Sequence, residues 1–139
     1  MTLSKSSIDA RREFFPTSPA LTRFLVRTME REGVLSSGMR AVEPCAGAGH
    51  ITRVLNEFPF SFLNVKQFDI DPFWGHEIVD ATTNDVEGEA YVTNPPFSLA
   101  IPITIQMIQN LSRRAGDGFV AVYHRISLME PAGGREQFW

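Results

Sequence analysis

Runs of β-branched and apolar residues recur along this 139-residue chain at intervals typical of an α/β sheet. They predict five strands, at 39–43, 64–68, 77–79, 90–93 and 118–123. Between most of these strands, apolar residues recur at helical spacing. The expected helices span about 19–30, 51–58 and 98–112.

Local signals define the ends and faces of these helices. Thr17 or Ser18 is a natural N-cap before Pro19. Leu21, Phe24, Leu25 and Met29 follow at helical spacing, and Gly33 is expected to end that helix. In the last helix four residues are expected to face inward: Ile101, Ile105, Ile108 and Leu111.

A helix followed by alternating strands and helices predicts an α/β fold with a mainly parallel sheet and helices on both faces. Residues 118–123 are apolar enough to be covered on both faces. The length fits one domain, 1–139, with a flexible start at 1–13 and a loop-like tail at 126–139.

Composition narrows the class of protein. A net charge of -3 and a pI of about 5.6 are not those of a strongly basic nucleic-acid binder. The single cysteine, Cys45, excludes an intrachain disulfide and a cysteine-based zinc site, and no metal site is expected. No apolar run is long enough to span a membrane and the N-terminus is polar, which together predict a cytoplasmic protein without membrane association.

Polar or glycine residues stand at four successive strand ends. Gly47 and Gly49 follow the first strand, and glycine lets a loop come close to a nucleotide-like ligand. Asp69, 20 positions beyond Gly49, is placed to accept from both hydroxyls of a ribose. Asp80 would either accept from the exocyclic amine of an adenine or cap the following loop. Because ligands bind at the carboxyl ends of parallel strands, these positions and Asn94 predict one site.

The fourth strand leads into Asn94-Pro95-Pro96-Phe97. Two prolines end the strand and fix the backbone, so that the Asn94 amide and the Phe97 ring are held in one orientation. An amide oxygen beside proline-fixed carbonyls suits a planar amino group, and Phe97 would stack on the ring that carries it. The alternative is a proline-rich turn with a buried phenylalanine.

With these residues in hand, the chain resembles class I S-adenosylmethionine-dependent methyltransferases that methylate amino groups, and among them N6-adenine DNA methyltransferases, including small phage-borne ones. The resemblance implies a Rossmann-like sheet and covers about residues 14–125. The segments that carry it are Phe15-Pro16-Thr17-Ser18-Pro19, Glu43-Pro44-Cys45-Ala46-Gly47-Ala48-Gly49, Asp69-Ile70, Asp80 and Asn94-Pro95-Pro96-Phe97.

The resemblance implies S-adenosylmethionine as cofactor and gives each segment a role. The glycine loop would hold the cofactor, Asp69 its ribose, Ile70 and Asp80 its adenine, and Phe15 and Thr17 its methionine moiety. Asn94 and the Pro95 carbonyl would accept hydrogen bonds from the target amine, in DNA or in RNA. Phe97 would stack on a base that has left its helix.

Family members usually complete the sheet with an antiparallel hairpin after the fifth strand, and here it is expected to be missing or incomplete. The chain is then a minimal enzyme, a fragment, or a homodimer formed through the exposed fifth strand. Arg11, Arg12, Arg113, Arg114, Arg125 and Arg135 form either a phosphate-facing rim or an ordinary solvated surface.

Several functions remain open from the sequence. Transfer to N4 of cytosine, to RNA or to the side-chain amide of a protein glutamine would use the same amine chemistry. A non-catalytic S-adenosylmethionine-binding module would explain a missing sheet edge but not the Asn94 turn. A nicotinamide dehydrogenase would explain Gly47, Gly49 and Asp69 and leave that turn unused.

Overall fold

The computed structural model describes residues 16–114 and 117–124. The elements, in chain order, are helix α2 (Pro19–Arg31), strand β1 (Met39–Glu43), helix α3 (His50–Leu55), strand β2 (Phe62–Asp69), the 3-10 turn η1 (Pro72–Trp74), strands β3 (Glu77–Ile78) and β4 (Ala90–Thr93), the turn η2 (Phe97–Leu99), helix α4 (Ala100–Ser112) and strand β5 (Phe119–Val122). The predicted order of helices and strands is confirmed, although α3 is shorter than expected.

The five strands form one sheet in the order β3-β2-β1-β4-β5, and every pair is parallel. The chain therefore builds outward from β1 through β2 to β3, then returns to place β4 on the other side of β1. This reversal brings the carboxyl ends of β1 and β4 side by side, which is where ligands bind in open parallel sheets.

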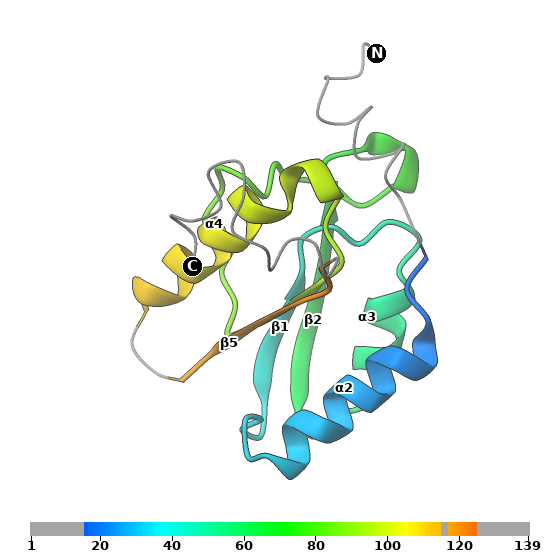
Figure 1. Cartoon of the computed structure of the whole chain (residues 1–139), viewed down its shortest axis with the longest axis vertical. Helices are drawn as coiled ribbons and strands as arrows, with labels where there is room; N and C mark the ends of the chain where they lie inside the picture. Colours follow the sequence, from blue (N-terminus) through cyan, green and yellow to red (C-terminus); the bar gives the residue numbers. More distant parts are fainter. Residues whose placement is uncertain (1–15, 115–116, 125–139) are drawn as a thin grey trace.

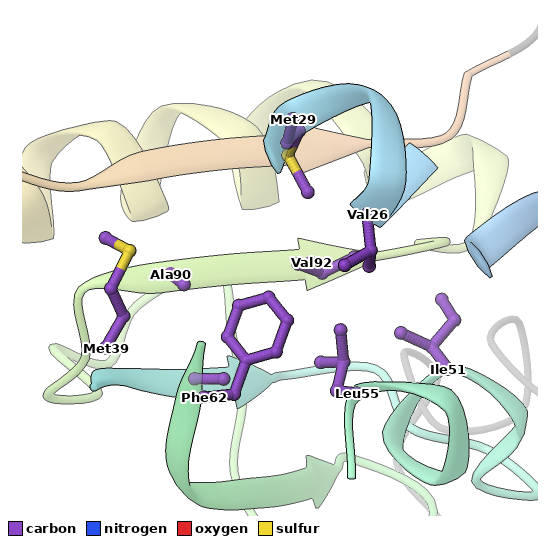
Figure 2. Close-up of a cluster of buried hydrophobic side chains, with 9 residues drawn as sticks. Val26, Met29, Met39, Ile51, Leu55, Phe62, Ala90 and Val92 are labelled. Carbon is purple, nitrogen blue, oxygen red and sulfur yellow. The ribbon is translucent and has the colours of Figure 1, made fainter. Parts of the chain in front are cut away.

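Helices cover both faces of this sheet, as predicted (Figure 1). On one face, α2 and α3 pack over β1 and β4, and Figure 2 shows Val26, Leu55 and Phe62 converging between helices and sheet. On the other face, Ile103 and Met107 of α4 pack against a cluster that includes Val42, Phe68 and Tyr91. Neighbouring residues Ala41 and Val42 of β1 belong to opposite clusters, as strand alternation requires.

The inward faces of the helices differ from the prediction. In α4, Ile105 and Ile108 are 39% and 50% exposed, while the buried set is Ala100, Ile103, Thr104, Met107 and Asn110. In α2, Leu21 and Phe24 are exposed and the buried residues are Thr22, Val26 and Met29. Gly33 follows the C-cap of α2 with φ of +74°, the left-handed geometry that favours glycine at a helix end.

Strand β5 is less covered than predicted. All four of its residues are partly buried, none fully. Phe119 and Ala121 contact the cluster under α2 and α3, whereas Val120 and Val122 contact the cluster under α4. Among residues 16–114 and 117–124, no helix is long and apolar enough to cross a membrane.

Candidate functional site

A cavity opens at the carboxyl ends of the central strands. It encloses about 490 Å³ of space, including the solvent at its mouth. Its walls come from the loops after β1, β2, β3 and β4 and from the start of α4. The lining residues are Pro44, Cys45, Asp69, Ile70, Trp74, Val79, Asp80, Ala81, Thr82, Asn94, Pro96, Leu99 and Ile103.

Glu43 lies at the junction of β1 and β4, behind this cavity. It is 1% exposed. Its Oε1 accepts hydrogen bonds from the Cys45 N–H (3.0 Å) and the Thr93 hydroxyl (2.6 Å), and Oε2 has no hydrogen-bond partner among the described residues. Burial raises the pKa of Glu43 to about 8, and the nearby Asp69 charge adds to the rise. Glu43 therefore keeps its proton at neutral pH.

The glycine loop after β1 is held by residues from the β2 side. Gly47 and Gly49 have φ of +51° and +82°, which only glycine adopts without strain. The Gly47 N–H donates to Asp69 Oδ2 at 2.9 Å, and the Gly47 carbonyl lies 2.7 Å from His76 Nε2. The two peptide groups that flank Gly47 are thus each held by a side chain from the β2–β3 region.

Asp69 combines a structural role with a place in the cavity wall. Besides Gly47, its carboxylate accepts from the Asp71 N–H at 2.9 Å, through Oδ1. Asp69 is 7% exposed, and burial raises its pKa above the ordinary value. Each carboxylate oxygen has a second lone pair, so Asp69 retains the capacity to accept from ligand hydroxyls. Asp71 caps η1 by accepting a hydrogen bond from the Phe73 N–H.

Asp80 caps the loop that follows β3. Its Oδ1 accepts from both the N–H (3.0 Å) and the hydroxyl (2.6 Å) of Thr82. Its backbone carbonyl accepts from the Asn84 N–H at 3.1 Å. The loop-capping alternative is therefore realised, and Asp80 lines the cavity as well.

Asn94 lies at the mouth of β4 and links two distant segments. Its Nδ2 donates to the Thr17 hydroxyl oxygen at 3.1 Å, across 77 positions of sequence. Pro96 lines the cavity beside it, and the Pro96 carbonyl accepts from Leu99 N–H to start η2. Phe97 is partly buried at the first position of η2 and does not line the cavity. Asn94 and Pro96 of the predicted turn thus line the cavity, whereas Phe97 does not.

The cavity brings together part of the predicted site. Seven of the predicted residues line it: Pro44, Cys45, Asp69, Ile70, Asp80, Asn94 and Pro96. Seven others are not part of its lining: Thr17, Glu43, Ala46, Gly47, Gly49, Pro95 and Phe97. Phe15 lies outside the described residues.

Sequence reasoning missed one wall of the cavity and one contact. Trp74, Val79, Leu99 and Ile103 give the cavity its apolar surface. Trp74 follows directly on the Asp71-Pro72 turn, and an aromatic residue in a loop at a strand's carboxyl end was the available signal. His76 bonds the glycine loop although its sequence context gives no indication of a partner.

The basic residues do not form a rim around the cavity. Arg113 and Arg114 lie at the far end of α4, about 20 Å of helix from Asn94. Both pair with Asp85, at 3.6 Å and 2.5 Å. Arg11, Arg12, Arg125 and Arg135 lie outside the described residues. Among those described, no lysine or arginine lines the cavity.

Two further residues behave as expected of packing groups. Burial, with Glu43 and Asp69 close by, raises the pKa of the Cys45 thiol well above its ordinary value, so the thiol is not activated. His124 lies 3.4 Å from the Thr104 hydroxyl, and burial lowers its pKa.

Comparison with known proteins supports the fold. No family model matches the sequence, and no curated protein matches it. Among solved structures, Thermoplasma acidophilum 1320 matches with a TM-score of 0.51 and 16% identity, over 73% of this chain and 62% of that one. A structure described as a putative RNA methyltransferase, PH1948 from Pyrococcus horikoshii, matches with a TM-score of 0.51 and 13% identity, over 80% of this chain and 62% of that one.

These neighbours support the α/β architecture, and the predicted Rossmann-like fold with a mainly parallel sheet is thereby confirmed. This chain spans about three fifths of the length of each neighbour. At such identities the likeness concerns the fold, and the chemistry has to be argued from the site.

Proposed function

We propose that this protein transfers the methyl group of S-adenosylmethionine to an exocyclic amine, with N6 of adenine in DNA as the favoured acceptor. The observation that carries the proposal is the placement of Asn94. Its side-chain amide bonds the Thr17 hydroxyl, is followed by two prolines, and lines a cavity that Asp69 and Asp80 also line.

The chemical types of the residues that line the cavity suit S-adenosylmethionine. Asp69 and Asp80 offer carboxylate acceptors for ribose hydroxyls and an adenine amine. Ile70, Trp74 and Ile103 offer apolar surface for a purine. The lining contains two acids, Asp69 and Asp80, and no lysine or arginine among the described residues, which suits a ligand that carries positive rather than negative charge.

The same features argue against a dinucleotide cofactor. Pyrophosphate binding uses loop N–H groups directed at the ligand and a helix N-terminus behind them. Here the Gly47 N–H donates to Asp69, and α3 has six residues. No lysine or arginine among the described residues lines the cavity to meet phosphate. A nicotinamide dehydrogenase would therefore lack its anion site.

In the proposed mechanism, S-adenosylmethionine supplies a methyl group activated by its sulfonium. Asn94 Oδ1 and the Pro95 carbonyl accept hydrogen bonds from the target NH₂ group, which directs the nitrogen lone pair toward the methyl carbon. Phe97 stacks on the base, outside the cofactor cavity. The N–C bond forms as the C–S bond breaks, and the proton lost from nitrogen passes to solvent. The chain contributes chiefly by positioning, which can lower a barrier by roughly 7–11 kcal/mol.

The decisive experiment is methyl transfer from labelled S-adenosylmethionine to single-stranded DNA, double-stranded DNA and RNA, followed by nucleoside digestion and mass analysis. We expect label on N6 of adenine in DNA. Asn94→Ala should keep cofactor affinity and lower transfer by about 100-fold or more. Asp69→Ala should weaken cofactor binding by about 10- to 100-fold, because it removes two ligand hydrogen bonds.

Asp85→Ala is the matched control, because Asp85 pairs with Arg114 and does not line the cavity. Label on N4 of cytosine or on RNA would change the acceptor and keep the reaction. Cofactor binding without transfer to any nucleic acid would favour a protein amide acceptor or a binding module that needs a partner. Failure to bind S-adenosylmethionine would overturn the proposal.

A further inference from the structure

Thr82 lies in the loop after β3, and this loop forms one wall of the cavity. Val79, Asp80, Ala81 and Thr82 are consecutive in the sequence, and all four line the cavity. Contacts on either side hold the loop to the fold. Ala81 is buried in the cluster under α4, and the Asn84 N–H donates to the Asp80 carbonyl at 3.1 Å. The Thr82 side chain is thus presented to a ligand from a fixed backbone.

The hydroxyl hydrogen of Thr82 is committed to Asp80. Thr82 Oγ1 lies 2.6 Å from Asp80 Oδ1, and the Thr82 N–H donates to the same oxygen at 3.0 Å. A carboxylate has only acceptors, so the hydroxyl must be the donor in this bond. A hydroxyl has one hydrogen and two lone pairs. While the bond to Asp80 lasts, Thr82 can therefore offer a ligand an acceptor and no donor.

Asp80 and Thr82 together give this part of the cavity one hydrogen-bonding character. Two donors from Thr82 hold Oδ1 of Asp80 and so restrict rotation of the carboxylate, whose second oxygen is also an acceptor. An exocyclic amine on a purine has two hydrogens to donate and suits such a pair. A carbonyl at the same ring position would bring its lone pairs against those of Asp80 and Thr82.

We propose that Thr82, held as an acceptor by Asp80, is a specificity-determining residue that makes the cavity select an amino-substituted purine over an oxo-substituted one. The inference rests on the proposed function, in which Asp80 accepts from the adenine amine of the cofactor, and it assigns to Thr82 the enforcement of that choice. An oxo-purine could bond the Thr82 hydroxyl only by drawing its hydrogen away from Asp80. That exchange forfeits a bond to a charged group, which is stronger than one between neutral groups.

The test compares two ligands that differ in one group. S-adenosylhomocysteine carries the amine, and S-inosylhomocysteine carries a carbonyl at the same ring position. In calorimetric titration of the full-length chain, the amine ligand should bind about 100-fold or more tightly. Thr82→Val keeps the β-branched shape and the backbone N–H to Asp80 but lacks the hydroxyl, so the ratio of the two affinities should fall by about 10-fold. Thr82→Ser retains the hydroxyl and should keep the ratio within about threefold of its original value.

Thr83→Val is the matched control, the same substitution one residue further along the loop. Thr83 is exposed, does not line the cavity, and its hydroxyl oxygen accepts from Asn84 Nδ2 at 3.3 Å. Its affinity ratio should equal that of the unmodified protein. Thr82→Ala, which also lacks the hydroxyl, should behave as Thr82→Val does and guards against a fault in the folding of one variant. An unchanged ratio in both variants would overturn the proposal, as would equal binding of the two ligands by the unmodified protein.

Adenosine and inosine separate this inference from the proposed function, because they lack the methionine moiety. The proposed function fails and the role of Thr82 stands if adenosine is preferred over inosine, Thr82→Val removes that preference, and S-adenosylmethionine binds no more tightly than adenosine. The inference fails and the proposed function stands if methyl transfer proceeds while Thr82→Val keeps the original affinity ratio. Binding of none of these ligands would refute both.

Discussion

Burial sets Glu43 apart from the other acids at its end of the sheet. Between the ordinary value of 4.5 and its folded pKa of about 8, Glu43 holds a proton in the folded protein that the unfolded chain releases. Unfolding in this pH window therefore releases a proton. Because a higher pH favours that release, the free energy of unfolding should fall as pH rises from about 4.5 to about 8.

The prediction is that Glu43→Gln flattens this pH dependence. One titrating group contributes at most about 1.4 kcal/mol per pH unit, and the glutamine, which does not titrate, contributes nothing. Urea unfolding at a series of pH values from 5 to 8 measures the slope. The control is Glu57→Gln, since Glu57 is on the surface, pairs with Arg23, and has a pKa lowered chiefly by that hydrogen bond.

Glu57→Gln should leave the slope in this window unaltered, because a lowered pKa acts only below the ordinary value. If Glu43→Gln and the unmodified protein show parallel curves, Glu43 is ionised in the folded state.

For single residues, the sequence predicted where they lie in the fold better than which side chains they contact. Asp69 and Asn94 follow from strand ends and proline geometry, because backbone direction places them. Thr17 was expected to meet a ligand, and in the structure it meets Asn94. Such a contact joins segments 77 positions apart, and no local pattern encodes which side chains meet over that distance.

Among the elements, two loops are linked by one side chain, the imidazole of His76. His76, between η1 and β3, lies 2.7 Å from the Gly47 carbonyl, while Asp69 at the end of β2 holds the Gly47 N–H. The glycine loop thus depends on the β2–β3 connection for its shape.

We therefore predict that His76→Leu weakens cofactor binding by about fivefold, the effect of one hydrogen bond, because the Gly47 carbonyl then loses its side-chain partner while the Gly47 N–H keeps Asp69. His76→Gln, which retains an N–H donor, should bind nearly as the unmodified protein does. Calorimetric titration with S-adenosylhomocysteine measures both. Thermal unfolding should show similar stability for the two variants, and equal affinities for His76→Leu and the unmodified protein would refute the role of this bond.

The helices show why the spacing of apolar residues predicted where helices occur in the sequence but not which of their faces are buried. The largest apolar residues of α4 include Ile105 and Ile108, which are exposed, whereas Thr104 and Asn110 are buried. Thr104 satisfies its hydroxyl on the Ala100 carbonyl, and Asn110 bonds Gln106 and the Asn84 carbonyl. Burying a polar side chain costs little free energy when it has a hydrogen-bond partner. The way a helix packs on the sheet therefore decides which of its faces is buried, and that face can include polar residues.

For the whole molecule, the outer edge of β5, which no other strand of the described residues pairs with, is the feature with the largest consequence. β5 is the last strand in the sheet order, and β4 is its neighbour in the described part of the chain. Phe119 and Tyr123 direct their N–H groups at the Glu89 and Thr93 carbonyls on the β4 side. By alternation, Val120 and Val122 direct theirs at the other edge.

We propose that a second copy of the chain pairs there. Sedimentation equilibrium at micromolar concentration should then give twice the monomer mass of 15.6 kDa. Val120→Pro removes an outward N–H without breaking the bonds to β4, and should shift the protein to monomer. Val120→Thr keeps both the N–H and the β-branched shape and serves as control. A monomer at every concentration would exclude this assembly.

The order of the sheet was predictable because parallel pairing, short connections and right-handed crossovers leave few topologies. The extent to which β5 is buried was not predictable. Whether an apolar strand is enclosed depends on chain segments or partners that its own sequence does not identify.

The position of Trp74 gives the cavity an optical readout. The chain has two tryptophans, Trp74 and Trp139, and the Trp74 indole forms part of the cavity wall beside Asp69 and Ile70. In a Trp139→Phe background, all indole emission would come from that wall. A purine that enters the cavity would change the intensity and wavelength of this emission, so occupancy could be followed in real time without an acceptor or an isotope.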